Sequence, residues 1–80
     1  MGIKSWTSKK FPGWRAYPIR QTRQGLEVLV ALPQSQSLYT RLFTSKVHAN
    51  IVVNDNMDLV DERYREAALF YLAFVTEITP

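Results

Sequence analysis

Residues 25–33, GLEVLVALP, contain the segment that decides the fold, because their side chains alternate as in a β-strand. One face of this strand carries Leu26, Val28, Val30 and Leu32, and the other face carries Glu27, Leu29 and Ala31. A period of two residues is the signature of a strand. The segment is apolar enough to be central in a sheet, and Pro33 ends it. We therefore predict a central strand over residues 26–32.

The residues before this strand predict a hairpin and an edge strand. TRQG, residues 22–25, is typical of a hairpin connection in which Gly25 takes a left-handed conformation. Residues 14–21 would return as a strand, and Trp14 would face the core. Pro18 has no amide donor, so it predicts an edge strand or a bulge at this point. Pro12–Gly13 is a turn dipeptide.

Two further segments allow more than one structure. Residues 3–11 alternate weakly, so they fit either a strand or an extended arm anchored by Trp6. Residues 35–47, SQSLYTRLFTSKV, fit both a helix and a strand, and their Thr, Tyr and Phe content favours a strand. HANIVVN, residues 48–54, is predicted to be a strand in either case.

The clearest element is a C-terminal helix over residues 58–79. Asp58 can cap it, and Asp61 and Glu62 lie in the first turn, where the helix dipole favours anions. Residues 67–75, AALFYLAFV, are apolar on every side of this helix, which is typical of a buried helix. One small sheet covers one face, so a second cover has to come from the middle of the chain or from another copy.

These elements predict a single α+β domain over residues 1–80, with mostly strands and turns in residues 1–54. Its antiparallel sheet of three to five strands would pack against one C-terminal helix. We favour a homodimer, because a core of this size is marginal alone. The residues expected at the oligomer interface are Leu69, Phe70, Leu72 and Phe74.

Composition excludes several classes of site. The chain has no cysteine, which removes disulfides and thiolate metal sites, and one histidine, His48, is too little for a zinc or iron site. We predict no metal and no cofactor. No nucleophile motif accompanies His48, and no glycine-rich phosphate loop is present, so we predict no enzyme. The longest apolar run has nine residues against about 20 for a membrane span, which favours a cytoplasmic protein without membrane contact.

Charge is distributed unevenly along the chain, whose net charge is +3. Residues 1–26 carry six Lys or Arg and no acid, whereas residues 50–80 carry six carboxylates and two arginines. Such asymmetry indicates an anionic partner for the basic half. Charge complementarity between the two halves, within one fold or across a dimer, explains it equally well.

The basic stretch KKFPGWRAYPIRQTRQG, residues 9–25, is the predicted binding surface. Clustered cations release counterions from nucleic acid, and an exposed tyrosine can stack on bases. The predicted binding residues are Lys9, Lys10, Arg15, Tyr17, Arg20 and Arg23. The leading hypothesis is a module whose basic hairpin docks on nucleic acid. The alternative is a protein-interaction module that binds an acidic protein surface, such as an inhibitor, adaptor or assembly factor of the kind that phages encode.

Overall fold

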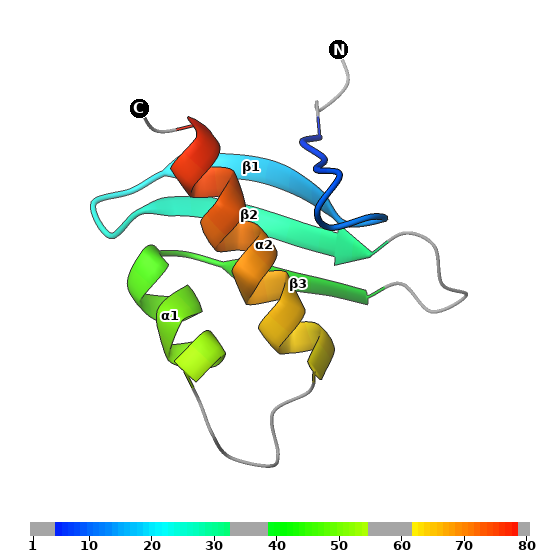
Figure 1. The fold of residues 1–80 in the computed structure, drawn as a ribbon. Coiled ribbons are helices and arrows are strands. Elements are labelled where there is room, and N and C mark those ends of the chain that lie inside the picture. The colour runs from blue at the N-terminus through cyan, green and yellow to red at the C-terminus, as the bar shows by residue number, and fades with distance from the viewer. Residues whose placement is uncertain (1–4, 33–38, 55–61, 79–80) are drawn as a thin grey trace.

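The computed structural model describes residues 5–32, 39–54 and 62–78. Three antiparallel strands form one sheet in the order β1-β2-β3, and two helices follow (Figure 1). The elements are β1 (Arg15–Gln21), β2 (Leu26–Leu32), β3 (Tyr39–Phe43), α1 (Lys46–Asn54) and α2 (Glu62–Ile78). Helix α2 crosses one face of the sheet, and α1 packs beside α2 (Figure 1). The predicted α+β class, with an antiparallel sheet and a C-terminal helix, is confirmed.

Strand β2 is central, as its sequence predicts. Val28 and Val30 are fully buried on the face that meets α2, which we call the inner face. Leu26 and Leu32 lie on the same side and pack against the same core. The other alternate set, with Leu29 at its centre, points to the opposite face, which we call the outer face.

The TRQG segment forms the predicted hairpin connection between β1 and β2. Thr22 and Gly25 exchange two backbone hydrogen bonds, of 2.8 and 3.3 Å, and Gly25 has a φ of 149°. A Cβ atom at Gly25 would lie 3.0 Å from the Cα atom of Ser45. Glycine is therefore required twice here, by its positive φ and by the close approach of the hairpin to the start of α1.

Pro18 lies in an edge strand and also beside a bulge, so both predicted roles are confirmed. Pro18 pairs with Val28, but Arg20 pairs with Glu27, so Ile19 is the extra residue of β1. A one-residue shift moves the following side chains to the other face of the sheet. Arg20 therefore shares the outer face with Glu27 instead of pointing toward the helices.

Residues 46–54 form helix α1, so the strand predicted over residues 48–54 is wrong. Ser45 caps this helix: its Oγ accepts a hydrogen bond from the His48 amide at 3.1 Å. Ala49 and Val52, three positions apart on one side, enter the core. Burial of this face outweighs the strand preference of the β-branched run Ile51–Val53, because strand preference is worth at most about 1 kcal/mol per residue and depends on context.

The two open segments are settled where the structure describes them. Residues 39–43 form β3, which agrees with the strand favoured for this part of residues 35–47, while residues 35–38 lie outside the described residues. Trp6 exchanges two 2.9 Å backbone hydrogen bonds with Ala16 as an isolated bridge. The N-terminal segment is therefore an extended arm anchored by Trp6, and Trp14 is buried as predicted.

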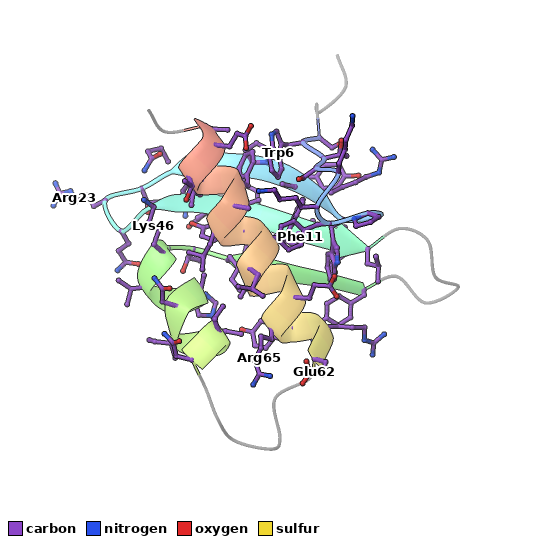
Figure 2. The ribbon with its side chains drawn as sticks, in the orientation of Figure 1. Trp6, Phe11, Arg23, Lys46, Glu62 and Arg65 are labelled. Atoms are coloured by element: carbon purple, nitrogen blue, oxygen red, sulfur yellow. The ribbon has the colours of Figure 1, made fainter. Side chains whose placement is uncertain are left out.

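Helix α2 is covered on three sides. The sheet lies under one side and α1 lies against another, so the middle of the chain supplies a second cover. The N-terminal arm covers the third side: the Trp6 ring lies 5.1 Å from that of Phe74, and the Phe11 ring lies 5.6 Å from that of Phe70 (Figure 2). Residues 58–61, with the proposed cap Asp58, lie outside the described residues.

Tyr71 ties α2 to the central strand, since its hydroxyl donates a 2.6 Å hydrogen bond to the Leu26 carbonyl. Replacing Tyr71 with Phe is expected to lower the free energy of unfolding by about 1 kcal/mol. Burial also raises the pKa of the Tyr71 phenol above its ordinary value of 10.0. The stability that depends on the neutral phenol is therefore complete below about pH 10 and is lost as the pH rises further.

Urea unfolding of both proteins from about pH 8 to about pH 11 checks this expectation. The Tyr71→Phe variant should start less stable and lose less free energy across that range, because its core side chain cannot ionise. If both proteins lost the same free energy of unfolding at alkaline pH, ionisation of Tyr71 would not be the cause of that loss.

Candidate functional site

The structure separates the predicted basic residues into two groups. Lys9 and Lys10 lie in the turn before β1, and Arg15 begins that strand. Arg23 lies at the hairpin tip beyond the other end of β1, at the same end of the molecule as Lys46 (Figure 2). A strand of this length spans roughly 20 Å. The exposed cations therefore do not form one compact patch.

Arg20 is already paired. Its Nε lies 2.8 Å from Glu27 Oε1, and a second guanidinium nitrogen lies 3.4 Å from Oε2. The hydrogen bond to Glu27 raises the pKa of Arg20 above its ordinary range. Among the six predicted binding residues, Arg20 is the one that has a carboxylate partner within the described parts of the chain. Arg15 donates to the Ser5 hydroxyl at 3.2 Å.

The outer face of the sheet carries an apolar row that crosses all three strands. Tyr17 pairs with Leu29, and Leu29 pairs with Leu42, so the three side chains lie side by side. Ile19 extends the row at the bulge. Ile19 is 56% exposed and Leu42 is 47% exposed. A groove of about 470 Å³, lined by Tyr17, Pro18, Ile19 and Leu29, lies at one end of the row.

This apolar outer face is unusual for a sheet with helices on one side. Such antiparallel sheets commonly alternate apolar residues toward the core with polar residues toward water. A strand that is apolar on both faces, as β2 is at Val28, Leu29 and Val30, is typical of a sheet covered on both sides. Neither described helix covers the outer face (Figure 1). We therefore take the outer face as the candidate site.

Charged residues flank the apolar row on both sides along the strands. The next row in one direction consists of Arg15, Ala31 and Thr40. In the other direction lies the Arg20–Glu27 pair. The rim of the outer face thus carries two arginines and one glutamate. Arg15, Tyr17 and Arg20 of this face were among the predicted binding residues, whereas Ile19, Leu29 and Leu42 were not. The second alternate set of β2, with Leu29 and Ala31, was the sequence signal for an apolar outer face.

The residues predicted for an oligomer interface are mostly occupied inside the single chain. Phe70 and Phe74 are buried, because the N-terminal arm covers them. Leu72 is half-buried against the core, whereas Leu69 is 42% exposed. Phe70 and Phe74 are thus not available to a second chain in this structure. The homodimer and the cytoplasmic location stay predictions.

His48 packs within the fold between aromatic side chains. Its ring lies 5.3 Å from that of Phe43, and its Nε2 lies 3.2 Å from the Tyr64 hydroxyl. Across residues 5–32, 39–54 and 62–78, no group of three or more histidines and carboxylates could hold a metal ion. No helix within these ranges has the length and apolar character needed to cross a bilayer.

Comparisons with protein-family models, curated proteins and solved structures find no match to this chain. The inference of function therefore rests on the geometry of the outer face. Two features of that face bear on the function: an apolar row across three strands that is exposed at Ile19 and Leu42, and a rim with more cations than anions.

Substitutions on the outer face are expected to leave the folded chain intact. Ile19→Thr and Leu42→Thr should each change the free energy of unfolding by no more than about 0.5 kcal/mol, because both side chains are largely exposed. The matched inner-face variant Val30→Thr should cost about 1–3 kcal/mol, because it buries an unpaired hydroxyl. Urea unfolding measures all three. A large loss at Leu42 would show that this face is already covered.

Proposed function

We propose that this protein is a small non-enzymatic binding module that recognises a partner protein through the outer face of its sheet. The observation that carries the proposal is the apolar row of the outer face, in which half-buried Tyr17 and Leu29 lie between exposed Leu42 and exposed Ile19. Contiguous exposed apolar side chains mark interaction sites on small proteins. Three of these four side chains are aliphatic, which suits packing against another protein better than stacking on bases.

The rim charges support a partner with an acidic surface. Arg20 and Glu27 neutralise each other, so the net positive charge beside the apolar row comes from Arg15. This charge favours the orientation and the association rate of an acidic partner. An inhibitor, adaptor or assembly factor works in this way, by occupying a surface of another protein. Such a role requires no catalytic group.

Affinity capture from nuclease-treated extract tests this proposal. The wild-type protein should retain one protein partner in stoichiometric amount, and Leu42→Glu should retain about tenfold less, because it places a carboxylate in the apolar row. Val47→Glu is the matched control, since Val47 is exposed on α1, away from the sheet. Equal capture by the wild type and Leu42→Glu would contradict a role for the outer face.

A second candidate is nucleic-acid binding, which one observation favours. Lys9, Lys10, Arg15 and Arg23 are exposed, and within the described residues none of them pairs with a carboxylate. If all four contacted duplex phosphates, log K should fall against log[salt] with a slope of about −3.6. Salt titration of binding to a generic DNA duplex measures this slope.

The paired arginine gives this measurement an internal control. Arg23→Ala should make the slope about 0.9 shallower, whereas Arg20→Ala should leave it unchanged, because Glu27 already holds that guanidinium. Binding that is absent at low salt, or that does not respond to salt, would exclude this candidate.

A further inference from the structure

We infer that the partner segment received by the outer face is a single amphipathic helix that carries acidic residues beside its apolar stripe. This inference rests on the proposed function and names the chemistry of the partner. Three features support it: the length of the apolar row, the geometry of edge strand β1, and the rim charge.

The length of the apolar row matches two turns of one helix. Neighbouring strands lie about 4.8 Å apart, so the row from Tyr17 through Leu29 to Leu42 spans about 10 Å across the strands. Positions i to i+7 of an α-helix also span about 10.5 Å, so a helix lying along the row sets its apolar stripe on these three side chains and turns its flanks toward the rim charges. Helix α2 already crosses the opposite face, where it packs against β2 and β3 (Figure 1). A helix on the outer face would complete a layer arrangement in which both faces of the sheet are covered.

The geometry of β1 disfavours the addition of a partner strand at this edge of the sheet and favours docking on the outer face. An added strand needs a row of free amide donors, and Pro18 has none. The bulge at Ile19 also breaks the regular spacing of that edge. On the face, by contrast, the same bulge forms the groove with Tyr17 and Leu29, which can receive an apolar anchor side chain from a helix.

The charge at the rim distinguishes between two possible occupants of the outer face, a second copy of this chain and an acidic helix. Arg15 lies about 7 Å from the apolar row in one direction along β1, and Arg20 with Glu27 lies on its other side. A second copy of this chain, placed face to face, would bring four arginines and two glutamates together. A helix with Asp or Glu beside its apolar stripe meets this rim with opposite charge.

A designed peptide tests the inference directly. The probe is a helix of about 18 residues, with leucines at i, i+3, i+4 and i+7 and glutamates beside them. One matched peptide has lysines in place of the glutamates, and a second has the glutamate sequence scrambled. Fluorescence anisotropy with the full chain at low salt should show the glutamate peptide binding about tenfold more tightly than either control.

Variants of the chain locate the binding on the outer face. Leu42→Glu and Ile19→Glu should each weaken the glutamate peptide about tenfold, while Val47→Glu should not. Arg15→Glu should reduce the preference for glutamate over lysine. Thermal unfolding checks that each variant is folded. Two face variants are used so that the test still holds if one of them does not fold.

The outcomes separate this inference from the proposed function. Equal affinity for the lysine peptide, or no effect of either face variant, would overturn the acidic helix. A dimer in sedimentation that Leu42→Glu dissociates would show instead that a second copy covers this face. If capture of a protein depends on Leu42 but the glutamate peptide does not bind, the chemistry of the partner is wrong and the docking surface stands. If neither the Leu42-dependent capture nor the binding of the glutamate peptide is observed, both the inference and the proposed function are wrong.

Discussion

The burial of most of the apolar segment of α2, residues 67–75, is the constraint on which the rest of the structure depends. This segment is apolar all round, so no single neighbour can cover it. Ala67 and Ala68 are fully buried, and their small side chains allow close packing against neighbouring elements. The sheet, α1 and the N-terminal arm each cover one side, with Trp6 placed over Phe74. Within the described residues, most of this small core is thus covered by elements of the same chain.

This solution places every described covering element on the inner face of the sheet, and no described helix covers the outer face. Helix α2 lies on the inner face with α1 beside it (Figure 1), and the aromatic residues of the arm pack against the same core. The central strand is nevertheless apolar toward both sides, at Val28 and Val30 inward and at Leu29 outward. A sheet with this strand at its centre buries its apolar outer surface only when something else covers it. The apolar outer face, on which the proposed partner would dock, is therefore a consequence of how the core is built.

Patterns between neighbouring residues predicted the sheet well. The features that were not predicted depend on contacts between residues far apart in the sequence. The alternation in β2, the Gly25 turn and the edge position of Pro18 depend on neighbouring residues and were all confirmed. Helix α1 was missed because its β-branched residues favour a strand locally, whereas tertiary burial of Ala49 fixes the helix. At the candidate site, composition grouped cations that the length of β1 separates. Leu42 could be assigned to the site only from the pairing of β3 with β2, which places it beside Leu29.

The bulge at Ile19 decides the chemistry of the outer face. In an unbroken register Arg20 would pair with Leu26 and point to the inner face. The extra residue instead turns Arg20 outward to Glu27 and brings neutral Gln21 opposite Leu26. Gln21 is exposed, so the shift changes which face carries the cation and leaves the core unaffected. The same shift leaves Ile19 exposed beside the groove and gives Glu27 an ion-pair partner at the rim. One inserted residue therefore determines both the apolar and the charged side chains at this end of the outer face.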